Sequence, residues 1–291
     1  MKVPVTVITG YLGAGKTTLL LRIARETDMR IAIVMNEFGQ IAVDSKIFEG
    51  KNIRIAELAG GCVCCSLSGE FGLAVEELIE KAKPEWIVVE TTGAAEPGAL
   101  AYDIKENMPL VKLDSIVTIV DADSVARFPS LGHTGREQIE LADILVLNKI
   151  DLVDKETLES VREKIKKINP RAIMLESERC GIDFGLLFGV ERDSRAKKHR
   201  IHKIELEYFD FVFDGALKHD AFVSFLESMP KGIYRSKGFV RTEKGSFLMN
   251  FVAGRYSLED FDCGKTELVF IGKDALGNKT KTIEALDSIR I

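Results

Sequence analysis

The stretch Gly10–Thr18, which reads GYLGAGKTT, constrains the fold more than any other part of the chain. It matches G-x-x-x-x-G-K-[ST], follows a strand-like apolar run at 5–9 and precedes a helical pattern at 16–25, the context in which this motif cradles phosphate. Glycines let backbone N–H groups surround phosphate oxygens, and the following helix directs its positive dipole end toward the same anion. We expect phosphate contacts from Gly13, Ala14, Gly15, Lys16, Thr17 and Thr18, with the Thr17 hydroxyl on Mg²⁺.

The first two thirds of the chain alternate strand-like and helix-like segments. Such alternation predicts an α/β fold with a mostly parallel sheet, covered by helices on both sides, because its strands are almost continuously apolar. The predicted strands span 5–9, 30–35, 52–58, 85–90, 115–120, 143–148 and 172–176, and the predicted helices span 16–25, 69–83, 135–142 and 155–168.

The pattern changes near residue 195, after the charged stretch 192–200. Beyond it, half-apolar alternation at 202–213 indicates a strand, 218–229 a helix, and 233–242, 246–254 and 266–272 further strands, before a final helix near 283–289. We therefore predict a P-loop nucleotide-binding domain at 1–195 and a small α+β domain with a mostly antiparallel sheet at 196–291.

Composition excludes several classes of protein. Residues 199–291 carry 14 Lys+Arg and 14 Asp+Glu, so the net charge of −5 arises entirely in the preceding part and argues against a nucleic-acid or anionic-membrane binder. No apolar run reaches the length of a membrane span, and Lys16 and its neighbours stand where a signal peptide would be cleaved. The crowding of three cysteines into four positions suits a reducing cytoplasm rather than a disulfide framework.

The segment 147–151, LNKID, predicts the base that is bound. At a strand end after a phosphate loop, the Asp151 carboxylate can accept hydrogen bonds from N1–H and the 2-amino group of guanine, a donor pair that adenine lacks. Asn148 would tether the base and the neighbouring loop, and the Lys149 stem would lie along the ring. Ser177, after the next strand, is a further candidate for positioning the base, whereas Asp121 is expected to be structural.

Three acidic residues are candidates for the hydrolytic chemistry. Glu90 ends the strand 85–90 and can hold a Mg²⁺-bound water, while Gly93 can bring its N–H to the γ-phosphate. Glu37 and Asp44 lie in the segment 36–44, NEFGQIAVD, which could approach Mg²⁺ as a switch segment. No arginine can be assigned to the transition state, so we expect slow hydrolysis that is helped by a partner, a homodimer contact or a metal.

The segment 60–66, GGCVCCS, predicts a metal site. Cys62, Cys64 and Cys65 offer thiolates, which favour Zn²⁺ and related ions, while Co²⁺ is bound comparably. A closed zinc site takes four ligands, so this site is either open or completed by a residue such as Glu37. An open site suits metal transfer. Cys180 and Cys263 stand alone and are expected to pack in the protein.

The order of phosphate loop, NEFG, GGCVCC, ETTGAAEP and NKID resembles the CobW family of metal-handling GTPases, within the class of urease and hydrogenase maturation GTPases. The segments 235–240 and 266–272 are similar to that family's C-terminal domain. The resemblance implies phosphate and Mg²⁺ binding at the P-loop, a metal on the three cysteines and guanine at 148–151. Met35 replaces a glutamate found in many relatives, and the His-rich tract that many of them carry is absent.

These observations predict a GTP-hydrolysing metallochaperone that delivers Zn²⁺ or Co²⁺ to a client protein or cofactor pathway, with GTP or GDP and Mg²⁺ as its ligands. Lys16, Asp44 and Glu90 are the expected catalytic residues. Three alternatives stay open: an activator of a cofactor-dependent enzyme with a structural metal, a P-loop small-molecule kinase, and a redox sensor that uses the cysteines.

Overall fold

The computed structural model describes residues 2–35, 53–57, 68–91, 97–128, 130–188 and 207–291. The chain divides into two units, Met1–Ile182 and Asp183–Ile291, each with its own sheet. Within the described residues, no helix is both long and apolar enough to cross a membrane.

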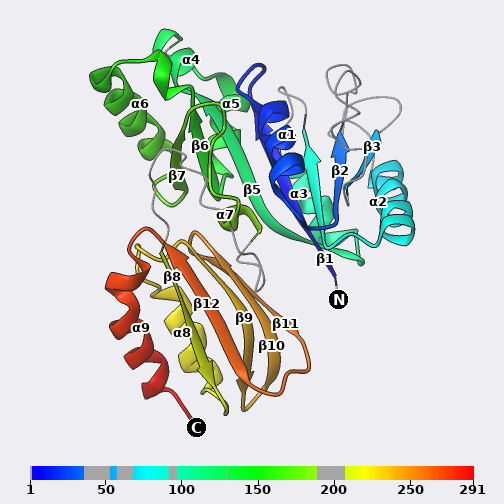
Figure 1. Ribbon diagram of the computed structural model, residues 1–291, viewed down its shortest axis with the longest axis vertical. Coiled ribbons are helices and arrows are strands. Elements are labelled where there is room, and N and C mark those ends of the chain that lie inside the picture. Colours follow the sequence, from blue (N-terminus) through cyan, green and yellow to red (C-terminus); the bar gives the residue numbers. More distant parts are fainter. Residues whose placement is uncertain (1, 36–52, 58–67, 92–96, 129, 189–206) are drawn as a thin grey trace. The chain divides into compact units, whose positions relative to one another are not determined.

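The first unit is built on a seven-stranded parallel sheet in the order β3-β2-β4-β1-β5-β6-β7 (Figure 1). The strands are β1 (Val3–Gly10), β2 (Ile31–Met35), β3 (Ile53–Glu57), β4 (Trp86–Glu90), β5 (Val111–Asp121), β6 (Ile144–Asn148) and β7 (Ile173–Ser177). All seven strands predicted from the sequence are present, so the predicted α/β fold with its parallel sheet is confirmed.

Within the described residues, six helices and one short turn lie between these strands. They are α1 (Lys16–Glu26), α2 (Ser68–Ala82), α3 (Pro97–Glu106), α4 (Ala122–Arg127), α5 (Gly132–Glu140), the 3-10 turn η2 (Ile150–Leu152) and α6 (Lys155–Ile168). The sequence patterns predicted α1, α2, α5 and α6 but not α3 and α4.

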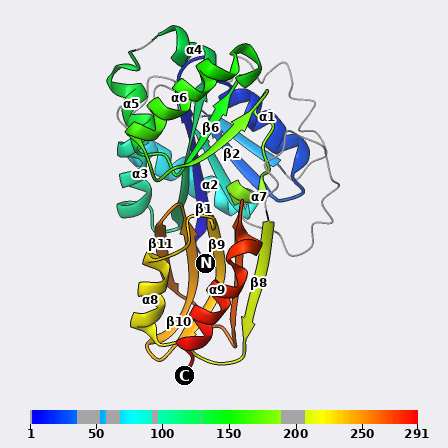
Figure 2. The same cartoon turned by 90° about the vertical axis from the view of Figure 1, so that its left-hand side faces the viewer.

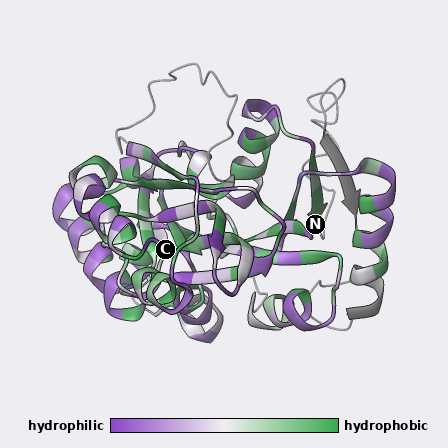
Figure 3. Ribbon diagram, turned by 90° about the horizontal axis from the view of Figure 1, so that it is seen from below, coloured by the Kyte–Doolittle hydropathy of each residue, from purple (hydrophilic) through white to green (hydrophobic). Residues whose placement is uncertain are grey.

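Helices cover both faces of the sheet of the first unit, because the connections between its strands run along the sheet in both directions. The connection through α1 leads to β2 on one side, whereas the connection through α3 leads from β4 back across β1 to β5. Right-handed crossovers in opposite directions place α1 and α3 on opposite faces. Figure 3 shows both hydrophilic and hydrophobic colours on the outer helices.

The second unit holds a five-stranded antiparallel sheet in the order β11-β10-β9-β12-β8, covered on one face by α8 and α9 (Figures 1 and 2). Its core cluster includes Phe209, Phe222, Phe251 and Phe270, all drawn from this unit. The elements are α7 (Gly185–Phe188), β8 (Glu207–Phe213), α8 (His219–Glu227), β9 (Arg235–Thr242), β10 (Gly245–Val252), β11 (Arg255–Asp260), β12 (Thr266–Gly272) and α9 (Ala275–Ser288). The predicted antiparallel α+β unit is confirmed, and β11 is an additional strand.

Candidate functional site

The phosphate loop lies between the end of β1 and the start of α1, and its glycines have the backbone conformations that the motif requires. Gly10, Gly13 and Gly15 have φ angles of 140°, 76° and 119°, in the region that favours glycine. A Cβ on Gly10 would lie 2.4 Å from the Ile119 carbonyl oxygen of β5, so the loop starts tightly against the neighbouring strand. The N-cap residue of α1 is Gly15, which offers no side-chain cap, and the first turn of α1 has no acidic residue. Among the described residues, the first N–H groups of α1 therefore have no competing N-cap side chain or first-turn carboxylate, which suits an anion site.

Lys16 lies across this loop. Its ammonium group donates to the carbonyl oxygens of Gly10 at 2.8 Å and Tyr11 at 3.3 Å, and the residue is only 7% exposed. Burial lowers the pKa of Lys16, and the negative charge of Glu90 opposes that shift. A buried cation beside two neutral carbonyls is poorly compensated, so a phosphate would be a much better partner.

Glu90 is placed near the loop by the pairing of β4 with β1. Its partner in the register is Ile8, and the next residue, Thr91, donates its backbone N–H to the Ile8 carbonyl at 3.0 Å. The buried hydroxyls of Thr91 and Thr9 also meet at 2.9 Å. These contacts fix the end of β4 against β1, so Glu90 lies within electrostatic range of Lys16. Thr17 is half-buried and Thr18 exposed in the first turn of α1.

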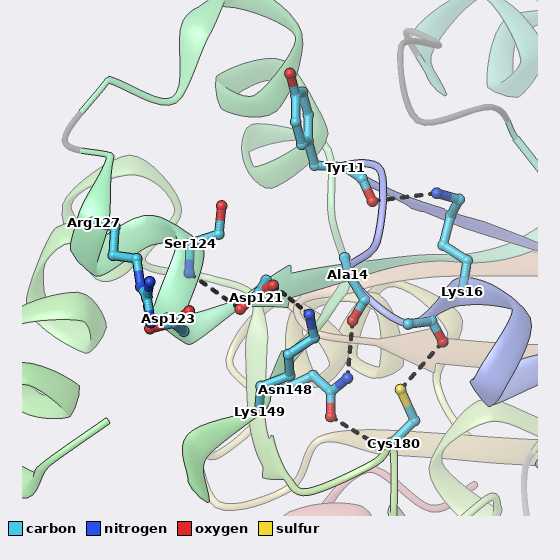
Figure 4. A network of polar contacts seen from close by, with 11 residues as sticks. Tyr11, Ala14, Lys16, Asp121, Asp123, Ser124, Arg127, Asn148, Lys149 and Cys180 are labelled. Carbon is cyan, nitrogen blue, oxygen red and sulfur yellow. Dashed lines mark hydrogen bonds and ion pairs between the residues drawn. The ribbon is translucent and has the colours of Figure 1, made fainter. Parts of the chain in front are cut away.

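Asn148 joins three loops of the site (Figure 4). Its Nδ2 donates to the Ala14 carbonyl of the phosphate loop at 2.9 Å, whereas its Oδ1 accepts from Ser177 Oγ at 3.1 Å and from the backbone N–H of Cys180 at 2.9 Å. The side chain is 2% exposed, so it acts as a rigid connector between the phosphate loop and the loop after β7.

Lys149 and Asp151 complete the segment after β6. Lys149 has a left-handed φ of 61°, and its ammonium group pairs with Asp121 Oδ2 at 2.7 Å (Figure 4). Asp121 Oδ1 also caps α4 by accepting from the backbone N–H of Ser124 at 3.1 Å. The Asp151 side chain is exposed, and no hydrogen bond joins it to the part of the chain that the structure describes. An exposed carboxylate beside an anchored lysine stem fits a purine that offers two donors.

Two residues contribute more than the sequence indicated. Ser177, predicted as a base-positioning candidate, is fully buried and donates to Asn148. Cys180, predicted to pack only, also places its thiol 3.3 Å from the carbonyl oxygen of Gly15, and burial raises the pKa of this thiol to about 12. The sequence signal for Ser177 was its place after the strand that follows Asn148, and the structure pairs the two residues in the register of β6 and β7. No comparable local signal marked Cys180.

Several predicted site residues lie outside the described residues: Glu37, Asp44, Cys62, Cys64, Cys65 and Gly93. Among the residues that are described, no group of three or more His, Cys, Asp or Glu side chains could hold a metal ion. The part of the predicted site that the structure describes comprises the phosphate loop, Glu90, Asn148, Lys149, Asp151 and the loop after β7.

This geometry agrees with the similarity of the chain to known proteins. The zinc chaperone CobW of a Sinorhizobium species is 32% identical over 262 residues, which cover 77% of this chain and 72% of that protein. The zinc chaperone YjiA of Escherichia coli K12 is 32% identical over 216 residues, covering 69% and 67%. A zinc-regulated GTPase metalloprotein activator of Schizosaccharomyces pombe is 38% identical over 187 residues, covering 60% of this chain but only 46% of the relative.

A solved structure shows the same fold. The crystal structure of a Zn(II)-bound triple mutant of the YjiA GTPase has a TM-score of 0.50 at 22% identity and covers 100% of both chains. Residues 4–176 match the family model of the CobW/HypB/UreG nucleotide-binding domain, and residues 206–289 match that of the cobalamin synthesis protein CobW C-terminal domain. The chain therefore belongs to the CobW/HypB/UreG family, as the order of its motifs predicts.

Proposed function

We propose that the chain is a GTP-hydrolysing zinc chaperone that couples its nucleotide state to the binding and delivery of zinc. The observation that carries the nucleotide part is the position of Asn148, which bonds to the phosphate loop through Ala14 and immediately precedes the base-reading segment. In this proposal, Asn148 would hold the phosphate loop at a set distance from the segment that binds the base. The names of the zinc chaperone and GTPase relatives support the metal part.

Selection of guanine follows from the exposed Asp151 carboxylate. It can accept from both N1–H and the 2-amino group of guanine, whereas adenine would leave it facing an acceptor. We expect Asp151→Asn to lose GTP affinity by roughly 100-fold, the effect of replacing a charged bidentate acceptor, and to gain affinity for xanthosine triphosphate, whose C2 carbonyl accepts from an amide. Asp28→Asn, an exposed carboxylate in the turn between α1 and β2, is the matched control. Equal binding of ATP and GTP by the unaltered chain would contradict guanine selection.

Mg²⁺ fits the residues around the β- and γ-phosphate positions. Thr17 presents a hydroxyl in the first turn of α1, and Glu90 lies close enough to affect the pKa of Lys16. When bound, the ion would neutralise phosphate charge and order a water, while Lys16 would bind the β- and γ-phosphates and Glu90 would orient the water. Asp44 and Gly93 are proposed to serve hydrolysis and γ-phosphate sensing. Replacing Glu90 by Gln should lower the hydrolysis rate more than nucleotide affinity.

The cargo site is proposed at Cys62, Cys64 and Cys65, with Glu37 as a further ligand. Strands β1, β2 and β3 are parallel, so their carboxyl ends lie along the same edge of the sheet as the phosphate loop. The segment with Glu37 follows β2, which ends at Met35, and the segment with the three cysteines follows β3, which ends at Glu57. At about 4.8 Å between strands, β3 lies roughly 14 Å across the sheet from β1. That spacing is short enough for a loop ordered by the γ-phosphate to affect the thiolates.

Zinc titration in three nucleotide states tests this coupling. We expect tighter zinc binding with a non-hydrolysable GTP analogue than with GDP or without nucleotide, and loss of tight binding when the three cysteines are replaced by Ser. Cys263→Ser is the control, since Cys263 lies in the second unit. Equal zinc affinity in all three states would exclude the coupling, and retained affinity in the triple variant would move the site elsewhere. Co²⁺ is the second metal to be titrated, because thiolates bind it comparably.

The client is proposed to be a metalloprotein or cofactor-pathway enzyme in the cytoplasm, received by the C-terminal domain, 196–291, while the GTPase domain is 1–195. A homodimer could supply the groups missing for fast hydrolysis. The relative named as a metalloprotein activator favours one alternative, in which the metal is structural and the nucleotide gates client assembly. Slow exchange of bound zinc in every nucleotide state would support that alternative over metal transfer.

A further inference from the structure

Cys180 and Asn148 hold two consecutive carbonyl groups of the phosphate loop (Figure 4). Asn148 Nδ2 donates to the Ala14 carbonyl at 2.9 Å, and the Cys180 thiol donates to the Gly15 carbonyl at 3.3 Å. The two donors are also joined to each other, because the Cys180 backbone N–H donates to Asn148 Oδ1 at 2.9 Å. The four residues therefore form a closed ring of contacts, and all of them belong to the first unit.

The two side chains of this ring pack closely on the backbone of Gly15. A Cβ at Gly15 would lie 2.6 Å from Asn148 Nδ2 and 2.9 Å from Cys180 Sγ. Asn148 is 2% exposed and Cys180 0%. Bulk water therefore does not compete with the two carbonyl groups for these donors, which strengthens both contacts.

The Cys180 thiol binds a carbonyl that already has a partner. The Gly15 carbonyl also accepts from the Leu19 backbone N–H at 2.9 Å, in the first turn of α1. Removing the thiol would therefore leave no unsatisfied carbonyl, and its loss would change the orientation of the peptide group instead. Burial raises the pKa of the Cys180 thiol to about 12, so the sulfur keeps its proton and remains a donor at neutral pH.

The orientation of these two carbonyl groups determines where two backbone N–H groups point. In a trans peptide, the carbonyl and the N–H of the next residue point in opposite directions. The carbonyls of Ala14 and Gly15 face Asn148 and Cys180, so the N–H groups of Gly15 and Lys16 point away from these side chains. Gly15 is the N-cap of α1 and Lys16 its first residue, positions whose N–H groups have no acceptor within the helix. Such N–H groups are the ones that a phosphate loop presents to its anion.

Cys180 makes both contacts from a strained backbone conformation. Its φ angle is 55° and that of the preceding Arg179 is 50°, so both residues lie in the left-handed region that favours glycine. Each costs free energy and persists only where the surroundings determine it. A glycine at position 180 would adopt this conformation without the cost, but it would lack the thiol that reaches Gly15.

We propose that Cys180 is a positioning residue for the phosphates of the bound nucleotide. Acting with Asn148, it orients two peptide groups of the phosphate loop so that the N–H groups of Gly15 and Lys16 face the β-phosphate. This inference rests on the nucleotide binding proposed above. It assigns the Cys180 thiol to phosphate affinity and not to selection of the base.

Four variants of the full-length chain test the proposal. Cys180→Ala removes the thiol donor but keeps the backbone N–H. Cys180→Gly also removes the donor and relieves the left-handed strain, so a defect that it shares with Cys180→Ala cannot come from strain. Cys180→Ser supplies a hydroxyl donor in place of the thiol. Cys263→Ala is the matched control, because Cys263 is also a free thiol but lies in the second unit.

Calorimetric titration compares GDP with GMP, which lacks the β-phosphate. We expect Cys180→Ala and Cys180→Gly to weaken GDP binding at least about threefold, the effect of one hydrogen bond, and to weaken GMP binding less. Cys180→Ser should bind GDP more tightly than Cys180→Ala, and Cys263→Ala should match the unaltered chain. A role of Cys180 that is limited to folding would lower the affinity for GDP and GMP equally.

The amide proton chemical shifts of Gly15 and Lys16 give a second readout, which does not depend on affinity. Both resonances should move downfield when GDP binds the unaltered chain, because each N–H donates to a charged phosphate oxygen. At saturating GDP, these changes should be smaller in Cys180→Ala. Identical changes in the two chains would show that the thiol does not orient these N–H groups.

The outcomes separate this inference from the function on which it rests. If the unaltered chain binds neither GDP nor ADP, the proposed function fails and the inference with it. If it binds ADP as tightly as GDP, guanine selection fails, and the same comparison of ADP with AMP tests Cys180. If GDP binds but Cys180→Ala and Cys180→Gly lose less than threefold, or lose GMP affinity equally, the role of Cys180 is overturned. If Cys180→Ala does not fold, Cys180→Gly decides, because it carries no left-handed strain at this position.

Discussion

The ammonium group of Lys149 lies 2.7 Å from Asp121 Oδ2, which joins the ends of the neighbouring strands β6 and β5. Lys149 stands in the left-handed region, so its backbone turns sharply after the strand, while its side chain is held by an acid that also caps α4. An acid expected to be structural therefore fixes the stem of the lysine predicted to cover the guanine ring.

Two substitutions of Asp121 distinguish its ion pair with Lys149 from its cap on helix α4. Asp121→Asn keeps a side-chain cap for α4 but loses the ion pair, so GDP affinity should fall by a few fold, the value of a partly exposed pair. Asp121→Ala should also lower the free energy of unfolding by about 1 kcal/mol through the lost cap. GDP titration and urea denaturation of both variants measure the two effects. Equal GDP affinity in all three chains would remove Asp121 from the nucleotide site.

Gly15→Ala and Gly13→Ala separate steric exclusion from backbone strain. Both glycines have positive φ, but a Cβ on Gly15 would lie 2.6 Å from Asn148 Nδ2 and 2.9 Å from Cys180 Sγ, whereas one on Gly13 would meet nothing within 4 Å. Gly15→Ala should abolish nucleotide binding by displacing Asn148, while Gly13→Ala should weaken it by about tenfold through strain of roughly 1 kcal/mol or more. Calorimetric titration with GDP measures the affinity of both variants. Weaker binding by Gly13→Ala than by Gly15→Ala would mean that the contact with Asn148 is dispensable.

Lys16 should destabilise the nucleotide-free protein, and the effect should depend on pH. Burial lowers the pKa of Lys16 below 10.5, so between the folded and unfolded pKa values the unfolded chain binds more protons. The free energy of unfolding therefore rises with pH between these two pKa values. Below the folded pKa, the destabilisation caused by the buried ammonium group is fully present. Lys16→Met should raise the melting temperature at pH 7, with a smaller gain near pH 10, and should abolish GTP binding. A gain that grows with pH would contradict the sign.

The Cys180 thiol should be unreactive in the folded protein. Burial raises its pKa to about 12, which lowers the thiolate fraction by about three orders of magnitude against an ordinary thiol, and its sulfur is enclosed beside Gly15. Iodoacetamide labelling followed by peptide mass spectrometry should modify Cys263, which is partly exposed, much faster than Cys180. In urea the two rates should converge. Rapid labelling of Cys180 under native conditions would show that the loop after β7 opens readily.

Phe270 tests the independence of the second core. It is fully buried, stacks on Phe209 at 4.9 Å and meets Phe225 edge-on at 6.3 Å. Phe270→Ala should lower the free energy of unfolding of the second unit by about 3–5 kcal/mol, whereas Phe128→Ala, 66% exposed, should change stability by less than about 0.5 kcal/mol. The single tryptophan, Trp86, lies in the first unit, so its fluorescence reports the unfolding of that unit, whereas circular dichroism reports both units. The urea midpoint of Phe270→Ala should therefore fall less by fluorescence than by circular dichroism. Equal changes in the two midpoints would indicate that the two units unfold together.

Local patterns predicted the sheet well because several of its strands are buried, largely apolar runs, as in β2 (IAIVM) and β6 (ILVLN). Helix α6 was predicted at its observed bounds, since its apolar residues Leu158, Val161 and Ile165 recur at helical spacing. Helix α3 was missed although Pro97 occupies its first position, a favourable start signal. Strand β11 was missed because its side chains are only partly buried and show weak alternation.

The site was predictable where its chemistry is written in consecutive residues, as in the phosphate loop and at Asn148, Lys149 and Asp151. The contacts of Cys180 were not, because its partners lie 32 and 165 residues away in Asn148 and Gly15. The same holds outside the site for Arg235 of β9, whose acceptors in α7 lie 49 and 48 residues away. Such pairings depend on the packed fold, and no local pattern specifies them.

The place of β1 in its sheet also determines when the nucleotide site can form as the chain folds. This strand precedes both of its partners, β4 and β5, by a long stretch of chain, since Val5 pairs with Ile87 and Val7 with Ile116. Parallel strands whose partners are distant in the chain fold slowly, and until they pair they expose apolar side chains and unpaired backbone edges. The phosphate loop is thus made well before the strands that complete its surroundings, and we expect a newly made chain to gain affinity for nucleotide only after more than a hundred further residues have been added.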